Sequence, residues 1–238
     1  MSSTPSHPDR PARQLRPGRH GLSREAVAGQ QRARMLDAVS EVVSEKGYVA
    51  MTVEDVIATA GVSRRTFYDQ FHGKEAAYLA AFEAAGTELI RRVQEAYAES
   101  RSLAGGVVSC LRTFLEFSAE EPRYAEMCLV EVLAAGPSAI ERRDAVLRAL
   151  AEVLHEGARR DPRAAPTPPL TAEWAIGGVY EVVYGRLING EAGELPALLP
   201  DLAYSIMLAY LGPDVALDLT HRLTGSRPAL LGDARPVS

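Results

Sequence analysis

The chain has 238 residues, of which 47% are hydrophobic, and its formal net charge is −5. This length suits one large domain or two small ones, with enough apolar content to bury a core. The net charge argues against indiscriminate binding to nucleic acid, and the two cysteines, Cys110 and Cys128, fall in apolar helical patterns typical of buried, reduced thiols.

Charge is unevenly placed along the chain. Residues 1–75 carry 11 Lys and Arg against 9 Asp and Glu, whereas residues 76–238 carry 15 against 22. A mildly basic first third on an acidic remainder fits a segment that meets DNA phosphates. Residues 1–28 have no apolar period, and we expect a disordered basic arm there. Its arginines either form a solvated tail or lie along DNA phosphates or in a minor groove.

Three helices are expected within residues 29–75. Apolar residues at helical spacing predict the first from about Gln30 to Lys46, ended by Gly47. Thr52 is a good N-cap for a second helix that stops at Gly61, with Asp55 placed near its positive end. Ser63 caps the third helix, whose Phe67 and Phe71 face inward. A short helix, a glycine turn, a capping serine and a second helix together predict a helix-turn-helix, so residues 29–75 are interpreted as a DNA-binding domain.

The third of these helices has the chemistry of a recognition helix. Arg64 and Arg65 stand at its start, where cations are mildly unfavourable, which indicates an anionic partner. Both can reach guanine O6 and N7, and contacts to bases or to phosphates remain open for them. Thr66 can touch a thymine methyl or a phosphate, and Tyr68 can offer its hydroxyl to a phosphate, although Tyr68 could simply shield the helix pair.

The rest of the chain predicts a helical body. A long helix from Lys74 connects the two parts, and residues 76–212 are interpreted as a ligand-binding and dimerisation domain. No alternating pattern or hairpin signal favours strands, so we predict an all-α fold of about nine helices. Residues 213–238 are expected to be a C-terminal tail with at most one amphipathic turn at 215–223. The further body helices are predicted at 102–119, 122–134, 138–160, 171–189 and 196–211.

Aromatic and polar side chains on the body helices are candidates for lining a ligand cavity. Phe114 and Phe117 are also candidates, although aromatic residues at helical spacing are more often ordinary core, and polar ones more often lie paired at a helix edge. Gly177, Gly178 and Gly185 each cost about 1 kcal/mol in a helix relative to alanine. A close helix approach at a dimer interface, or a ligand against the backbone, would offset that cost. The predicted ligand-binding residues are Arg123, Met127, Glu131, His155, Trp174, Tyr180 and Tyr184.

Nothing in the sequence predicts an enzyme. The five histidines are scattered without metal-ligand spacing, and no phosphate-cradling glycine loop follows a strand, so neither cofactor nor metal is expected. The chain begins without the apolar core of a signal peptide, and no charge-free apolar run reaches the length of about 18 residues that a bilayer requires. We therefore expect a cytoplasmic protein without membrane contact.

The run from Arg34 to Phe82 resembles the TetR family of bacterial transcriptional regulators. It covers about 50 of the residues, and it is specific because turn, cap, aromatic pair and lysine all occur at the expected spacing. The matching motifs are Gly47-Tyr48, Thr52-Val53, Ile57-Ala58-Thr59-Ala60-Gly61-Val62-Ser63, Phe67-Tyr68-Asp69-Gln70-Phe71 and Lys74-Glu75.

The resemblance implies an Ω-shaped homodimer that binds double-stranded operator DNA through two heads. It also implies an interface made by residues 171–211, a cavity for a small apolar or amphipathic ligand, and repression relieved by that ligand. Regulators without a small-molecule ligand, controlled by a protein partner, and activators remain alternatives. The family anchors the DNA backbone at the positions of Thr52 and Lys74. The predicted DNA-binding residues are thus Thr52, Ser63, Arg64, Arg65, Thr66, Tyr68 and Lys74.

Overall fold

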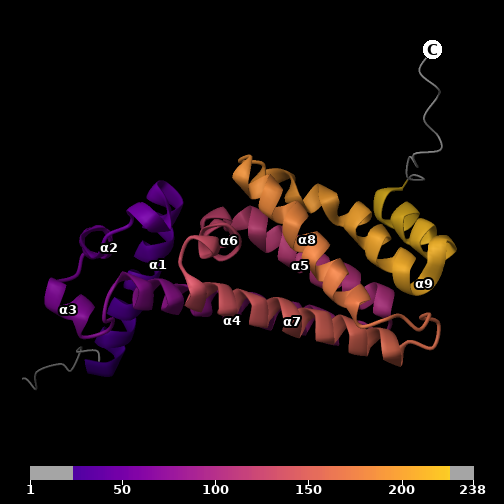
Figure 1. The fold of residues 1–238 in the computed structure, drawn as a ribbon, viewed down its shortest axis with the longest axis horizontal. Coiled ribbons are helices and arrows are strands. Elements are labelled where there is room, and N and C mark those ends of the chain that lie inside the picture. The colour runs from indigo at the N-terminus through magenta and orange to yellow at the C-terminus, as the bar shows by residue number, and fades with distance from the viewer. Residues whose placement is uncertain (1–23, 226–238) are drawn as a thin grey trace, which may run out of the picture.

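The computed structural model describes residues 24–225, and all regular structure within this range is helical. Nine α-helices and two 3₁₀ segments follow one another, which confirms the predicted all-α fold (Figure 1). Their bounds are α1 Arg24–Ala50, α2 Val53–Ala60, α3 Arg64–Tyr68, α4 Lys74–Ala98, α5 Leu103–Glu120, α6 Pro122–Leu129, η1 Glu131–Leu133, α7 Pro137–Arg160, α8 Leu170–Ile188, η2 Ala192–Leu198 and α9 Leu199–Thr224.

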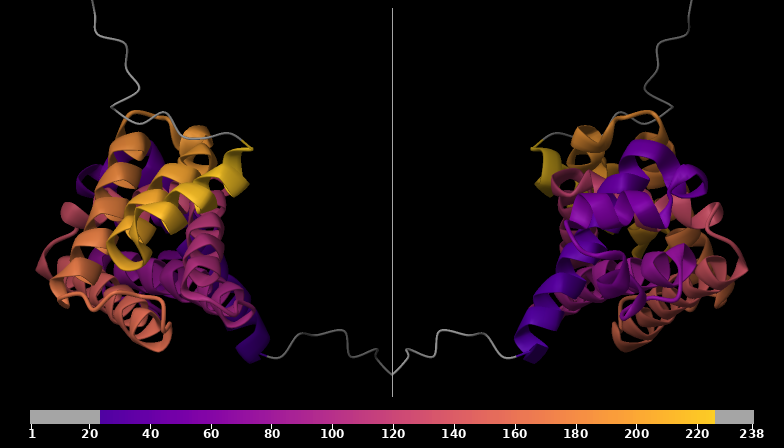
Figure 2. Two further views of the ribbon diagram at one scale, coloured as in Figure 1. Left: turned by 90° about the vertical axis from the view of Figure 1, so that its right-hand side faces the viewer. Right: turned by 90° about the vertical axis from the view of Figure 1, so that its left-hand side faces the viewer.

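The helices form a head, a body and a connector. Helices α1–α3 make the head at one end, α5–α9 make the body, and α4 runs from one to the other (Figure 1). Seen from the head end, α1–α3 lie in front of the body helices, and the first turns of α1 extend away from the rest (Figure 2). The long α4 is therefore the element that both parts share.

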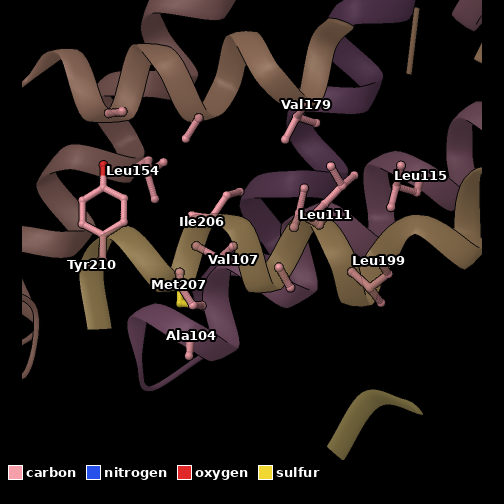
Figure 3. Close-up of a cluster of buried hydrophobic side chains, with 14 of the residues drawn as sticks. Ala104, Val107, Leu111, Leu115, Leu154, Val179, Leu199, Ile206, Met207 and Tyr210 are labelled. Carbon is pink, nitrogen blue, oxygen red and sulfur yellow. The ribbon is translucent and has the colours of Figure 1, made fainter. Parts of the chain in front are cut away.

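Two buried clusters hold these parts together. In the body, side chains of α5, α8 and α9 point toward one another, among them Leu111, Val179 and Ile206 (Figure 3). The head cluster surrounds Phe67 and Tyr78 and also includes Met127 and Val132, which belong to α6 and η1. Because the head core contains residues of the body, the head packs against α6 and η1 as well as continuing into α4.

Local signals explain the helix ends of the head. Gly47 has φ 77°, which is not a helical value, so the regular helix of α1 is interrupted at the glycine where the sequence predicts its end. Thr52 and Asp55 form a complete capping box at the start of α2, and Gly61 ends that helix with φ 61°. Ser63 caps α3, while Phe67 is fully buried and Phe71 nearly so. These caps and turns set the angle between α2 and α3.

Both predicted terminal segments need correction. Helix α1 begins at Arg24, so residues 24–28 are helical rather than part of a disordered arm, and the rest of that arm lies outside the described residues. At the other end, residues 213–224 continue α9 instead of forming a tail. Gly212, with φ 78°, bends the helix but does not end it, because Ala216 and Leu219 beyond it are buried in the body core. Residues 226–238 lie outside the described range.

Within residues 24–225, the segment Ala192–Thr224 is long and apolar enough to cross a membrane by length and composition alone, with a mean hydropathy of 1.3. It contains charged residues such as Asp201 and Asp214, so it is not the charge-free run of about 18 residues that the sequence was expected to lack. In the structure it is η2 followed by α9, and Ile206, Met207 and Tyr210 lie buried in the body core. Core helices of soluble proteins pass the same test, so this composition is weak evidence for a membrane span.

The far end of α4 is fixed in the body by Tyr97. A methyl group on Gly106 of α5 would lie 2.5 Å from Tyr97 Cε2, and one on Gly157 of α7 would collide with the Tyr97 hydroxyl. These two glycines, which the sequence analysis did not single out, give the Tyr97 ring its space. Gly177, Gly178 and Gly185, by contrast, have no such neighbour within 4 Å in the part of the chain that the structure describes.

Replacing Gly106 by alanine is expected to destabilise the protein by about 1–3 kcal/mol, because the added methyl group overpacks the site of Tyr97. Gly29 of α1 provides a matched control, since a methyl group there meets nothing within 4 Å. Gly29→Ala should stabilise α1 by about 0.5–1 kcal/mol through helix propensity. Urea unfolding at one fixed protein concentration measures the stability change in both variants. Equal stability of the two variants would contradict the packing around Tyr97.

Candidate functional site

The recognition helix α3 is short and held at its start by Ser63. The Ser63 hydroxyl accepts a hydrogen bond from the Thr66 backbone N–H at 3.0 Å and lies 2.8 Å from the Thr66 hydroxyl. Phe67 anchors the helix in the head core with no exposed surface. The opposite face is open to solvent, since the Arg64 and Arg65 side chains are 67% and 91% exposed.

The two arginines form only weak contacts within the chain. Arg64 lies 3.0 Å from Glu54 and over the ring of Tyr68, and Arg65 lies 4.0 Å from Asp69. Exposed ion pairs of this kind typically contribute about 0–1 kcal/mol, so neither guanidinium is held back from a stronger anionic partner. Tyr68 is also exposed beside them. The face of α3 therefore presents donors that can reach a major groove.

Thr52 serves the backbone of its own helix. Its hydroxyl accepts from the Asp55 backbone N–H at 3.1 Å and donates to the Asp55 carboxylate at 2.8 Å. Hydrogen bonds from Lys46 and Thr52 hold the pKa of Asp55 down at about 2, so the carboxylate is ionised at neutral pH. Thr52 and Ser63 are thus helix caps in the structure. A DNA contact by either residue stays a prediction.

Lys74 makes hydrogen bonds within the chain, and its contact with a DNA phosphate stays a prediction. Its ammonium group donates to the backbone carbonyls of Tyr48, Val49 and Met51, each at 3.1 Å, and lies 4.7 Å from the centre of the Tyr48 ring. An ammonium group has three N–H donors, so these carbonyls occupy all of them. Lys74 therefore holds the segment between α1 and α2 against the start of α4.

Glu131 joins the body to this same segment, and ligand binding by Glu131 stays a prediction. Its carboxylate accepts the Tyr48 backbone N–H at 2.7 Å, beside Gly47. Tyr48 also meets Tyr78 edge-on at 4.9 Å, and the Tyr78 hydroxyl donates to the Met127 carbonyl at 2.6 Å. Burial raises the pKa of Tyr78, so that hydroxyl keeps its proton. Met127 is fully buried in this junction and is not among the residues that line the body cavity described below.

Helix α6 adds further hydrogen bonds between head and body. The Tyr124 hydroxyl donates to Asp37 of α1 at 2.7 Å, and the Ser44 hydroxyl of α1 donates to Glu126 at 2.7 Å. Cys128 and Leu129 of the same helix line a cavity in the body. Helix α6 consequently contacts the head and the cavity at once.

The cavity is enclosed by α4, α5, α6, α7 and α8 and has a volume of about 170 Å³. Its wall is almost wholly apolar and includes Phe114 and Phe117, which the sequence offered as candidates beside the alternative of ordinary core. Both cysteines belong to it, and burial raises the pKa of Cys110 to about 11 and that of Cys128 to about 12, so both are thiols at neutral pH. Six residues of the wall come from the connector α4, which are Phe82, Ala85, Gly86, Leu89, Ile90 and Val93.

Of the seven predicted ligand-binding residues, Tyr180 alone lines this cavity. Tyr184 stacks on Tyr180 with ring centres 6.1 Å apart but is not part of the wall. Trp174 is 66% exposed on the outer face of α8, and Arg123 lies exposed over the Tyr124 ring. His155 is half-buried on α7 away from the wall, and its Nδ1 has no partner. These residues, like Met127 and Glu131, lie outside the wall of this cavity, and ligand binding by them stays a prediction.

Arg143 of the cavity wall was missed, although the sequence carries a signal for it. With Leu147, Leu150 and Leu154 it occupies positions spaced four, three and four residues apart on α7. An arginine in an apolar stripe is unusual because burying an unpaired charge is costly. The apolar side of α4 is predictable from sequence. Which residues on that side border a cavity is not, because the cavity forms only where the other four helices pack around α4.

An exposed recognition helix on a helix-turn-helix head, joined to a helical body, defines the fold of a DNA-binding regulator. Residues 35–81 match the family of bacterial regulatory proteins known as the tetR family. The match covers the helix-turn-helix and the start of α4, so this part of the chain is similar to the DNA-binding domain of TetR-family regulators. The body lies outside the matched range, and comparison with curated protein sequences gives no match.

Solved structures agree with the fold. The fatty acid degradation regulator FadR of Bacillus halodurans matches with a TM-score of 0.68 at 19% identity, over 74% of this chain and 94% of that one. FadR of Bacillus subtilis in complex with stearoyl-CoA matches with a TM-score of 0.67 at 21% sequence identity, over 74% of this chain and 98% of that one. The complex of SmeT with triclosan matches with a TM-score of 0.62 at 20% sequence identity, over 76% of this chain and 91% of that one. SmeT is the repressor of a multidrug efflux pump of Stenotrophomonas maltophilia. At these identities the likeness concerns the fold alone.

Proposed function

We propose that the protein is a cytoplasmic, homodimeric transcriptional regulator, a repressor that a small apolar or amphipathic ligand releases from its operator. The observation that carries this proposal is the apolar cavity, whose wall includes the two elements that hold the head, α4 and α6. The FadR complex with stearoyl-CoA and the SmeT complex with triclosan support ligand binding by a protein of this fold.

DNA binding is assigned to the open face of α3. Arg64, Arg65, Thr66 and Tyr68 present their polar groups there, and Phe67 fixes the helix from behind. Arginine pairs bidentately with guanine, and threonine contacts thymine methyl groups or phosphates. Thr52 and Ser63 stand at the helix starts beside this face.

Dimerisation is assigned to residues 171–211. On α8, Trp174, Gly178 and Ile188 lie on one exposed face with the half-buried Gly185 between them, and Leu208 of α9 is exposed as well. Within residues 24–225, a methyl group added to either glycine would meet nothing within 4 Å. Glycine within a helix costs about 1 kcal/mol relative to alanine, and a second copy packed closely against α8 would offset that cost.

Control by the ligand is assigned to the shared helices. A ligand that widens the cavity displaces α4 directly, and it displaces α6, which carries its shift to Tyr48 through Tyr78 and Glu131. Two heads read successive major grooves when their separation is about 34–36 Å, so a shift of a few ångströms lowers affinity. A head-to-head distance that stays the same with and without ligand, measured between spin labels, would refute this mechanism.

Fluorescence anisotropy tests the proposal directly. The purified protein is titrated onto duplex DNA from its own upstream region and onto a scrambled duplex, across a salt series. We expect selective binding whose log K falls with log salt by a slope of about −0.9 per phosphate contact. Octanoate and 1-octanol, added as probes, are expected to weaken the selective binding. A folded dimer that binds neither duplex would refute the proposal.

A further inference from the structure

Arg143 is the one charged side chain in the wall of the body cavity, among the residues that the structure describes. It projects from α7, and its side chain is only 19% exposed. The remaining wall is built from aliphatic, aromatic and thiol groups with few polar atoms. A largely buried guanidinium needs anionic or strongly polar partners, because desolvating its charge is costly.

The contacts within the chain leave this guanidinium partly unused. Arg143 Nε and Nη2 donate to one oxygen of Asp144 at 3.0 and 2.6 Å, and Nη1 lies 3.5 Å from the Tyr180 hydroxyl. A guanidinium has five N–H donors, so two are left. Asp144 is 39% exposed, and it neutralises Arg143 from the solvent side.

The other polar groups of the wall are already engaged. The Tyr180 hydroxyl donates to the Leu129 carbonyl at 2.6 Å, and the Ser118 hydroxyl donates to the Phe114 carbonyl at 2.8 Å. Both cysteines keep their protons at neutral pH and are weak donors. The polar end of a ligand therefore finds its free donors at Arg143.

We propose that the cavity selects amphipathic carboxylates, with the carboxylate on Arg143 and the apolar part among the side chains of α4, α5 and α6. The proposal deepens the ligand-binding function proposed above and rests on it. Arginine suits this task because its planar fork bonds carboxylates through two parallel N–H groups, and such charge-assisted bonds are about twice as strong as neutral ones. The ring of Tyr180, 5.4 Å from Cζ, supports the guanidinium from one side.

The experiment compares octanoate with 1-octanol, which share an eight-carbon chain and differ in the charge of the head group. Binding to the full-length protein is measured by calorimetry. Since hydrogen bonds to charged groups contribute about 1.5–3 kcal/mol, we expect octanoate to bind at least about tenfold more tightly. In Arg143→Met the octanoate affinity should fall to that of the alcohol, while the alcohol affinity stays within about threefold.

Two further variants serve as controls for the role of Arg143. Arg148→Met removes an exposed arginine from the same helix and should leave both affinities unchanged. Arg143→Lys keeps the charge and should retain part of the preference, and thermal unfolding establishes that each variant is folded. Equal binding of the two probes by the unaltered protein, or a preference that survives in Arg143→Met, would overturn the role of Arg143 alone. Failure of both probes to bind would overturn ligand binding in the cavity as well.

Discussion

Replacement of both Arg64 and Arg65 by alanine is expected to remove selective binding to operator DNA. Each arginine is exposed on the open face of α3 and has only a weak partner in the chain. A bidentate arginine–guanine contact gives about 1–3 kcal/mol of discrimination, so each loss should cost about 5- to 150-fold in affinity for the operator. The fold should persist, because neither side chain belongs to a buried cluster.

The single variants separate base contacts from phosphate contacts. An arginine that reads a base should, on removal, lower binding to the operator and relax selectivity at one position. An arginine that meets a phosphate should lower binding to all duplexes and reduce the salt slope by about 1. Anisotropy on the operator and a scrambled duplex measures both quantities, with Arg148→Ala as the control. A double variant with undiminished selectivity would contradict the assignment of α3 as the recognition helix.

The head could be predicted from sequence because its signals are local. A cap such as Ser63 and a turn glycine such as Gly61 act within a few residues, and Phe67 and Phe71 lie one helical turn apart. The family motif adds their spacing. Contacts with distant parts of the chain are not local signals, so the glycine at 212 indicates a helix end, although Ala216 and Leu219 beyond it pack into the body core and α9 continues.

The cavity could not be predicted to the same degree because five helices build it. Periodicity separates a buried face of a helix from an exposed one, but it does not tell core from cavity wall. Phe114 and Met127 have equally apolar surroundings in the sequence, yet the first lines the cavity and the second fills the junction with the head. Glu131 was interpreted as a ligand group for the same reason, since its partner Tyr48 is 83 residues away in the chain.

Lys74 shows the difference between a family motif and its role in this chain, and substitution by methionine tests it. Methionine keeps the apolar stem but leaves the carbonyls of Tyr48 and Met51 part-buried without a donor, whereas the exposed carbonyl of Val49 can be hydrated. An unsatisfied buried group costs about 1–3 kcal/mol, so we expect Lys74→Met to destabilise the protein by about 3 kcal/mol in denaturant unfolding. DNA affinity should fall with it, because Thr52, the cap of α2, directly follows Met51.

The only other lysine of the chain is a matched control. Lys46 pairs with Asp55 at 2.7 Å, but its partner is a side chain near the surface rather than the backbone of a turn. Lys46→Met should therefore cause a much smaller loss of stability than Lys74→Met. If the two variants were equally stable while Lys74→Met alone lost DNA affinity, the ammonium group of Lys74 would reach a phosphate, as the family resemblance implies. A large loss of stability in Lys74→Met would instead mean that this lysine acts on DNA through the turn it holds, since phosphate contacts outside the protein core do not stabilise the free protein.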